Sequence, residues 1–314
     1  MGWWKMPKLQ AQPEGCGYNR RLFQSTHGEF GSEGRFSHLP LVSRNDFASI
    51  HGMPEWTAIL ILGMIEGITE FLPISSTGHM LLAEHWLPHR QPEVFIAVIQ
   101  SGAVLAVLLV FTRRLGQWLT QWREKETQEF LLKLAAAFLI TAVGGVILKK
   151  TGFKLEKNPA PIAWATLIGG VLILAVERWL RGRSLRDQIG WPVALAVGAG
   201  QLLAVVFPGL SRSGATILMA LALGSSRPAA TEFSFLLGIP TLLSAGVLEI
   251  YGALHQAPAG ETVHWPMVLL GTTVAAVTAF ASVKWLLRFI QSHTFSGFGW
   301  YRIGLGILIL FLVR

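Results

Sequence analysis

Glu66 and Glu70 lie four residues apart in the stretch "EGITEFLPISSTGH". This stretch stands between two strongly apolar segments. Side chains at this spacing project from one face of a helix, about one turn apart. Two carboxylates so close in a low dielectric repel each other, so one must be protonated unless a cation or an arginine joins them. They could instead extend to a membrane interface, but glutamate has a short stem, and ionisable residues inside membrane segments are functional by default. We therefore predict that both are catalytic.

The same stretch ends with hydroxyl side chains and a histidine, Ser75, Ser76 and Thr77 followed by His79. Imidazole can attack phosphorus or move a proton to a leaving group near neutral pH. A lone histidine near an interface usually has no catalytic role. Here, however, the carboxylates could orient or charge the ring, and the hydroxyls could bind a phosphate oxygen. These neighbours favour His79 as a catalytic residue.

A second polar stretch, "FPGLSRSGAT" at 207–216, contains Arg212. A planar guanidinium binds phosphate or carboxylate through two parallel hydrogen bonds. Backbone N–H groups at a helix start, hydroxyl donors and one arginine together make a phosphate cradle. The serines could serve only as helix N-caps, but that role does not explain the arginine. The predicted phosphate-binding residues are Arg212, Ser211, Ser213 and Thr216.

The composition indicates which elements position these residues. Of the 314 residues, 52% are hydrophobic and only 14% are charged, whereas a water-soluble domain of this length needs more charge to cover its surface. Many of the 12 Trp fall near the ends of apolar runs, as in the aromatic belts at membrane interfaces. The net charge of +8 comes mostly from connecting loops, so nucleic acid is not a predicted partner. The single cysteine, Cys16, excludes an intramolecular disulfide and a cysteine-based metal site.

The apolar segments predict an all-α polytopic integral membrane protein. A spanning helix needs roughly 20 mainly apolar residues, and about six segments approach or exceed that length. The others come as two pairs, each broken by a proline-containing polar turn. Irregular backbone at membrane depth is tolerated only where protein buries it or it lines a wet cavity, so each pair predicts a re-entrant helical hairpin. The predicted spans are 93–112, 129–148, 160–179, 230–254, 266–289 and 299–313, and the hairpin segments are 55–72, 76–88, 190–206 and 213–224.

The two hairpins predict an inverted-topology repeat. When the turn prolines are superposed, Ser76 falls on Ser211. Glu66 then falls on Gln201. An odd number of spans separates the hairpins, so the second copy is inverted, a recurrent plan for membrane sites. The predicted parts are repeat one at about 53–148, a connecting span at 160–179, repeat two at about 190–289 and a last span at 299–313.

Residues 1–52 differ from the rest of the chain. They are polar and rich in glycine, and they contain no apolar run long enough for a signal peptide or a span. We exclude them from the predicted fold, which leaves 53–314 as the membrane domain. Met53 could be the true start, which would make the extension an artefact, and a genuine disordered tail is the alternative.

The positions of Lys and Arg predict the orientation in the membrane. Loops near 113–128, 180–189, 225–229 and 288–298, with the helix-end Arg178, hold ten Lys and Arg, whereas the opposite loops hold about five. Loops rich in Lys and Arg face the cytoplasm. In this orientation the first hairpin enters from the outside and the second from the cytoplasm.

At these residues the sequence closely resembles the undecaprenyl-diphosphate phosphatase family of bacterial inner membranes, also called the bacitracin-resistance family. The resemblance covers about 53–314 and rests on "EGITEFLPISSTGH" and "PGLSRSGAT", which look like the two motifs of the family. It implies an inner (plasma) membrane enzyme that dephosphorylates the C55 polyprenyl diphosphate, recycles the lipid carrier for peptidoglycan and confers bacitracin resistance. It implicates Glu66, Glu70, Ser76 and His79 from the first motif, and Ser211, Arg212 and Thr216 from the second.

The resemblance also implies roles. The family is generally helped by a divalent cation, and Mg²⁺ or Ca²⁺ held by Glu66 and Glu70 suits the preference of hard cations for oxygen ligands. Phosphoryl transfer needs positive charge on the non-bridging oxygens, an in-line nucleophile and a group that assists the leaving oxygen. Arg212 would clamp the phosphates. His79 is predicted as nucleophile or general base, with Ser76 as the competing nucleophile, and the spacing does not rank them.

The main alternative is a transporter or flippase for undecaprenyl phosphate, because inverted repeats with broken helices are transporter architecture. A carrier needs no nucleophile or metal, so the cluster of Glu66, Glu70 and His79 favours an enzyme. A cation channel gated by the paired glutamates is opposed by Arg212. The sequence leaves open whether the protein forms a homodimer and whether it also flips the lipid. The family suggests that the site opens outward.

Overall fold

The computed structural model describes residues 53–87, 91–153, 158–255 and 264–313, and the eleven elements within these ranges are all helices. Residues 1–52, predicted as a polar extension, lie outside the described residues. The helices are α1 (Glu55–Thr69), α2 (Ser76–Trp86), α3 (Glu93–Val110), α4 (Thr112–Thr120), α5 (Lys125–Lys150), α6 (Pro159–Trp179), α7 (Trp191–Val206), α8 (Arg212–Ala222), α9 (Arg227–His255), α10 (Trp265–Phe289) and α11 (Ser296–Leu312).

The helix boundaries confirm the predicted all-α class and agree closely with the predicted segments. Within the described ranges, four helices are long and apolar enough to cross a membrane, namely α5, α6, α9 and α10. The bent pair of α3 and α4 makes a fifth if it is counted as one span. The chain is therefore a multi-pass membrane protein. Because α11 has only 17 residues, helix length does not confirm six full spans.

The segment 113–128, predicted as a loop, contains the helix α4. This helix turns by 68° from α3, and it contains no buried residue. Its apolar residues Leu115, Trp118 and Leu119 recur at helical spacing, so they form one face, opposite its polar residues. The pattern is that of a helix lying along the membrane interface. The loop prediction was wrong because it counted only the charges of this segment.

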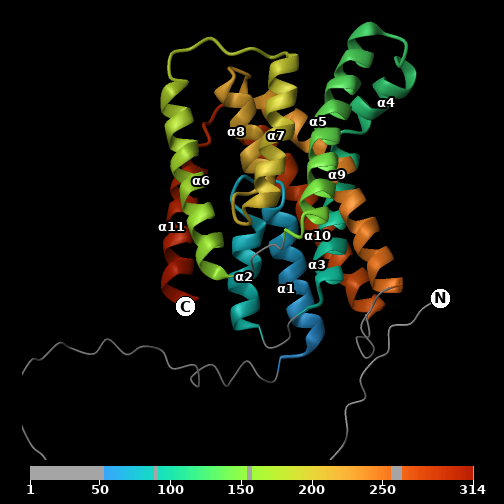
Figure 1. Ribbon diagram of the computed structural model, residues 1–314, viewed down its shortest axis with the longest axis vertical. Coiled ribbons are helices and arrows are strands. Elements are labelled where there is room, and N and C mark those ends of the chain that lie inside the picture. Colours follow the sequence, from blue (N-terminus) through green and yellow to red (C-terminus); the bar gives the residue numbers. More distant parts are fainter. Residues whose placement is uncertain (1–52, 88–90, 154–157, 256–263, 314) are drawn as a thin grey trace, which may run out of the picture. The chain divides into compact units, whose positions relative to one another are not determined.

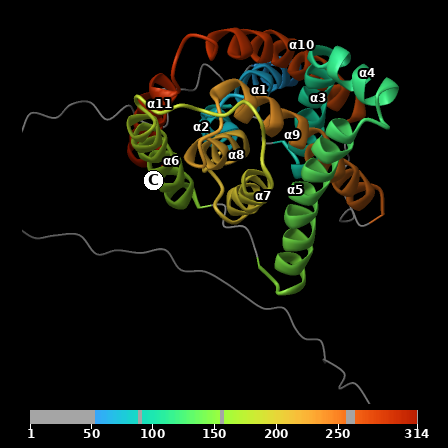
Figure 2. The ribbon, with the colours of Figure 1, turned by 90° about the horizontal axis from the view of Figure 1, so that it is seen from above.

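The two broken helix pairs lie inside the helical bundle and approach each other end to end. In Figure 1, α1 and α2 occupy the lower half and α7 and α8 the upper half. Viewed from above, α2 and α8 lie inside an arc made by α6, α7, α5, α10 and α11 (Figure 2). The first pair packs on α10 through α1, and the second packs on α5 through α7. The helices α3 and α9 pack on each other, and α6 packs on α11.

Glycines allow the closest helix contacts. In lipid no hydrophobic force drives apolar helices together, so small residues that let backbones approach carry much of the packing. A Cβ atom at Gly63 would lie 2.8 Å from the carbonyl oxygen of Gly271, and one at Gly67 would lie 2.3 Å from that of Ala275. These two glycines therefore bring α1 directly against the backbone of α10.

Aromatic packing holds the first turn in place. Phe71, which follows α1, meets Phe235 of α9 edge to face with ring centroids 5.1 Å apart. Both side chains are fully buried in the largest apolar core. Edge-to-face pairs of this kind contribute beyond the area that they bury, so they anchor the turn on α9.

Two serines form the breaks within the helix pairs. Ser75 precedes α2 and Ser211 precedes α8, with φ of 74° and 69°, the only positive φ values of non-glycine residues in the described part of the chain. Such backbone is costly and persists only where other contacts fix it. Each serine accepts a hydrogen bond from the N–H of a glycine, Gly78 or Gly214. The structure thus places Ser75, not the predicted Ser76, in the local geometry of Ser211.

We predict that Gly67→Ala destabilises the protein. The added methyl group would lie within 2.3 Å of a backbone oxygen of α10, which cannot move without shifting a whole helix, so a loss of about 1–3 kcal/mol is expected. Thermal unfolding of the purified protein in detergent should show a lower Tm. Gly145→Ala is the control, because nothing lies within 4 Å of its new Cβ. An equal Tm for the two variants would contradict the packing role of Gly67.

Candidate active site

The two polar turns meet, and side chains of neighbouring helices donate hydrogen bonds to backbone carbonyl oxygens of the turns. Ser213, in the first turn of α8, donates through Oγ to the carbonyl oxygens of Glu70 (3.2 Å) and Leu72 (3.0 Å). Thr166 of α6 donates to the carbonyl oxygen of Gly209 in the second turn (3.1 Å). Backbone groups that leave helical geometry at membrane depth need such partners. The turns are therefore enclosed by protein and face each other, as the sequence predicts.

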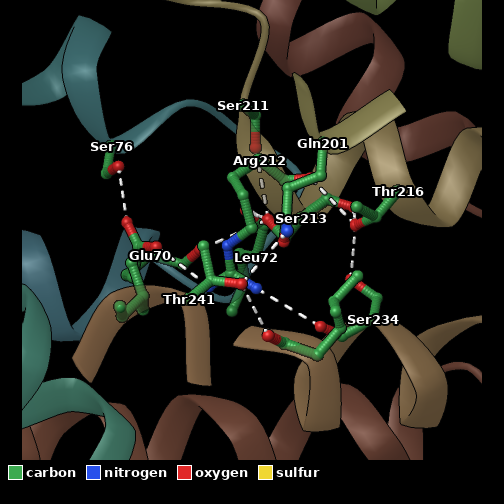
Figure 3. Close-up of polar contacts among 12 residues, drawn as sticks. Glu70, Leu72, Ser76, Gln201, Ser211, Arg212, Ser213, Thr216, Ser234 and Thr241 are labelled. Carbon is green, nitrogen blue, oxygen red and sulfur yellow. Dashed lines mark hydrogen bonds and ion pairs between the residues drawn. The ribbon is translucent and has the colours of Figure 1, made fainter. Parts of the chain in front are cut away.

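Arg212 of the second turn reaches Glu70 of the first (Figure 3). Its Nη2 lies 3.0 Å from Oε1 of Glu70, and the two side chains are 12% and 5% exposed. Nη1 donates to the carbonyl oxygen of Ser234 in α9 (3.3 Å). The other oxygen of Glu70, Oε2, accepts a hydrogen bond from Oγ of Ser76 (2.9 Å). A hydroxyl bonded to a carboxylate that a third group orients is the arrangement of an activated nucleophile.

Glu66 is fully buried beside this chain of contacts. In the part of the chain that the structure describes, neither of its carboxylate oxygens has a hydrogen-bond partner, and the same holds for Nε of Arg212. The side chains of Glu70 and Gln100 of α3 nevertheless lie close enough to its carboxyl group for weak hydrogen bonding, and Arg212 acts on its charge. A buried carboxylate needs a proton, a cation or a donor. Unpaired carboxylate oxygens and an unpaired guanidinium N–H together indicate a place for a ligand that carries both positive and negative groups.

The carboxylates alone form an incomplete metal site. Among the described residues there is no group of three His, Cys, Asp or Glu side chains that could hold a metal ion. Mg²⁺ is nevertheless often held by one or two carboxylates together with substrate phosphates and water. Glu66 fits this ligand set because its oxygens are unpaired, whereas both oxygens of Glu70 already have partners. The donor set suits a cation that binds together with a phosphorylated ligand.

The predicted phosphate-binding hydroxyls already have protein partners. Ser211 caps α8 by accepting from the N–H of Gly214 (3.2 Å), which is the alternative that the sequence left open. Thr216 is fully buried, donates to the carbonyl oxygen of Arg212 (2.8 Å) and contacts the hydroxyl of Ser234. With Ser213 joining the turns, these three hydroxyls shape the loop that presents Arg212.

His79 has different partners from the carboxylates. Within the described ranges, no hydrogen bond or ion pair joins it to Glu66, Glu70 or Arg212. Its Nδ1 lies 2.7 Å from the carbonyl oxygen of Ser75, and its Nε2 lies 2.7 Å from the hydroxyl of Tyr301 in α11. The structure therefore brings together Glu66, Glu70, Ser76 and Arg212 and leaves His79 at the side of this group.

Arg302 of α11 supports the site, and the motifs did not predict it. Its side chain is 1% exposed. It donates to carbonyl oxygens of both turns, Pro73 (3.4 Å) and Gly209 (3.1 Å), and to that of Thr166 (3.1 Å). It therefore ties the two turns to α6. The available signal was a lone arginine in the apolar run "WYRIGLGILIL", since ionisable residues in membrane segments are functional by default.

Both polar turns lie within the part of the chain that matches a known protein family. Residues 59–308 match the model of a family described as bacitracin resistance protein BacA. A protein named undecaprenyl-diphosphatase from Rhizobium etli is 49% identical over 252 residues, 80% of this chain and 94% of that protein. Proteins of the same name from Xylella fastidiosa and Xanthomonas oryzae pv. oryzae are 47% and 45% identical, and each alignment covers 82% of this chain and 98% or 97% of the relative.

We expect opposite effects on stability from neutralising the two glutamates. Glu70→Gln leaves the guanidinium of Arg212 buried without its counter-charge, which should cost about 3 kcal/mol. Glu66→Gln removes a buried carboxylate that has no partner in the described structure, so stability should stay equal or rise. Thermal unfolding in detergent, without substrate and with a chelator present, measures both effects. A similar loss of Tm in both variants would contradict the lack of a hydrogen-bond partner at Glu66.

Proposed function

This chain belongs to the bacitracin resistance protein BacA family, and we propose that it hydrolyses undecaprenyl diphosphate to undecaprenyl phosphate and inorganic phosphate. Curated relatives with the name undecaprenyl-diphosphatase share 45% to 49% of their residues with it over nearly their whole length. The observation that carries the proposal is the contact chain from Ser76 through Glu70 to Arg212, which joins the two turns. It provides a nucleophile, a base and a phosphate-binding group within one enclosed site.

The contacts favour Ser76 over His79 as the nucleophile. Arg212 exchanges its bond to Glu70 for oxygens of the diphosphate, and its unpaired Nε offers one more donor. Glu70 then takes the proton of the Ser76 hydroxyl, and Oγ forms a bond to the terminal phosphorus. The bridging P–O bond breaks, and undecaprenyl phosphate leaves. Water hydrolyses the phosphoserine and releases inorganic phosphate, with His79 as a general base for this second step.

A divalent cation is part of the proposal. Glu66 would hold it together with phosphate oxygens, because its own oxygens are buried without a partner in the described residues. When bound, Mg²⁺ or Ca²⁺ supplies positive charge to the non-bridging oxygens of the substrate. Glu66 can therefore bind a cation before substrate enters, whereas both carboxylate oxygens of Glu70 are already bonded to side chains.

The architecture that we propose is an inverted repeat in the inner (plasma) membrane, with about six spans and two re-entrant hairpins. Equivalent contacts support it: α1 packs on α10 as α7 packs on α5, and α3 packs on α9. The site opens outward, and the prenyl tail of the substrate stays in lipid. Assembly as a homodimer remains a prediction from the sequence.

A flippase for undecaprenyl phosphate is the competing function. It would use the same arginine and the same enclosed turns. It would have no use for a serine hydroxyl bonded to a carboxylate that an arginine orients. The Ser76 to Glu70 contact therefore favours hydrolysis.

We predict that Arg212→Ala and Ser76→Ala each reduce phosphate release from undecaprenyl diphosphate by at least about a hundredfold, the order seen when a transition-state contact or nucleophile is lost. Phosphate is measured with purified protein in detergent. Arg183→Ala and Ser292→Ala, two exposed positions in loops, are the matched controls and should keep full activity.

The outcomes separate the candidate functions. If Ser76→Ala still releases phosphate, Ser76 is not the nucleophile, and that role returns to His79. No release by well-folded wild-type protein, with lipid phosphate still bound, would favour the flippase.

Removal of divalent cations should lower phosphate release by about tenfold or more, and Mg²⁺ or Ca²⁺ should restore it. Glu66→Gln should be weakly active and no longer respond to the cation, because the unpaired carboxylate is gone. Glu129→Gln, on the exposed side of α5, is the control and should respond as the wild type does. Equal activity with and without chelator would contradict a role for a divalent cation at Glu66.

A further inference from the structure

A histidine and a tyrosine from distant parts of the chain form a defined pair beside the site. His79 is in α2 and Tyr301 is in α11. The tyrosine hydroxyl lies 2.7 Å from Nε2 of the imidazole. The two rings are nearly parallel, with an interplanar angle of 7° and centroids 5.6 Å apart. The stacking and the hydrogen bond together fix both the plane and the rotation of the imidazole.

The second ring nitrogen determines the tautomer. Nδ1 of His79 lies 2.7 Å from the carbonyl oxygen of Ser75. A carbonyl oxygen can only accept, so Nδ1 carries the proton. In the neutral ring Nε2 therefore has a lone pair and accepts the hydrogen bond that Tyr301 donates. Any proton that His79 gains or loses must pass through Nε2, where the tyrosine hydroxyl lies.

A tyrosine hydroxyl suits this position because it can both donate and accept. Next to the neutral imidazole it donates to Nε2, and next to the imidazolium it accepts from Nε2. The contact therefore persists in both protonation states of His79, and the ring need not turn. Tyr301 is also 50% exposed, so the protein leaves part of this side chain uncovered, and the inference requires that water reaches its oxygen there.

We propose that Tyr301 is a positioning residue through which His79 exchanges protons, an inference that rests on the proposed function. The tyrosine hydroxyl gives its proton to Nε2 and takes one from a water molecule, so one N–H bond and one O–H bond form as two O–H bonds break. The hydroxide equivalent left in the water supplies the oxygen that attacks the phosphoserine. The P–O bond to this oxygen forms as the bond between phosphorus and Oγ of Ser76 breaks, and Oγ takes back the proton that Glu70 holds. The tyrosine hydroxyl then accepts the proton of Nε2 and gives its own to water. The structure thus assigns to α11 a residue that completes the general base.

Tyr301→Phe tests the proposal, because it keeps the stacked ring and removes only the hydroxyl. We expect kcat for phosphate release to fall about tenfold, the order of one lost hydrogen bond, with KM unchanged. The chain offers a matched control in Tyr251, which stacks on His255 with ring centroids 4.3 Å apart, well outside the two turns. Tyr251→Phe should leave both constants unchanged.

A double-mutant cycle separates proton exchange from a structural role. In a His79→Ala background, Tyr301→Phe should cause no further loss, since the two residues act as one unit. The same fractional loss in both backgrounds, or full activity of Tyr301→Phe, would overturn the proposal.

Nitrogen NMR of the imidazole in the folded wild-type protein gives a readout that does not depend on activity, and the loss of a signal in His79→Ala identifies His79 among the nine histidines. Protonated Nδ1 and unprotonated, hydrogen-bonded Nε2 are expected for His79. A proton on Nε2 in the neutral ring would overturn the proposal, even if Tyr301→Phe failed to fold. Absence of phosphate release by the wild type would instead count against the proposed function. The observed tautomer would still show whether Nε2 of His79 accepts a hydrogen bond from Tyr301.

Discussion

The ion pair between Glu70 and Arg212 is the contact on which the rest of the site depends. Each residue lies beside a break in a helix, where backbone groups lose their helical hydrogen-bond partners and an unpaired group is costly. A nearly buried pair is favourable only if further hydrogen bonds satisfy its remaining atoms. Ser76 and Ser234 supply two such bonds, and Nε of Arg212 is left without a partner among the described residues. Because Ser213 also donates to the backbone of the first turn, neither turn is complete without the other. The site exists only where the two hairpins meet.

The last helix stabilises this junction from outside both hairpins. Arg302 donates to carbonyl oxygens of both turns, and its neighbour Tyr301 bonds to His79. Two consecutive residues of α11 therefore make hydrogen bonds to the site, one to the backbone of both turns and one to the side chain of His79. Arg302 has carbonyl oxygens rather than a carboxylate as its partners, so it neutralises no acid of the site. Nε of Arg212 and the carboxyl oxygens of Glu66, which have no hydrogen-bond partner among the described residues, remain available to the ligand.

The two hairpins contribute different chemistry. Gln201 of α7 is buried and donates to the hydroxyls of Thr141 and Thr241, so its side chain serves helix packing. In the proposed repeat it corresponds to Glu66, a carboxyl group that has no amide N–H to donate to neighbouring hydroxyls. The first hairpin thus provides the acids and the hydroxyl, and the second provides the arginine. A diphosphate needs both kinds of group at once, which is consistent with one site at the junction rather than one in each hairpin.

The sequence alone determined the helices other than α4, the two breaks and the residue types of the site, because apolar length, proline and polar clusters act locally. It did not determine which groups touch. Glu70 and Arg212 are 142 residues apart, and His79 and Tyr301 are 222 apart, so no spacing rule relates them. The sequence grouped His79 with the glutamates, did not identify Arg302, and aligned Ser76 with Ser211 where the backbone places Ser75. Only the packing of α11 and the two hairpins decided these partners, since hydrogen bonds between distant helices depend on how those helices are placed.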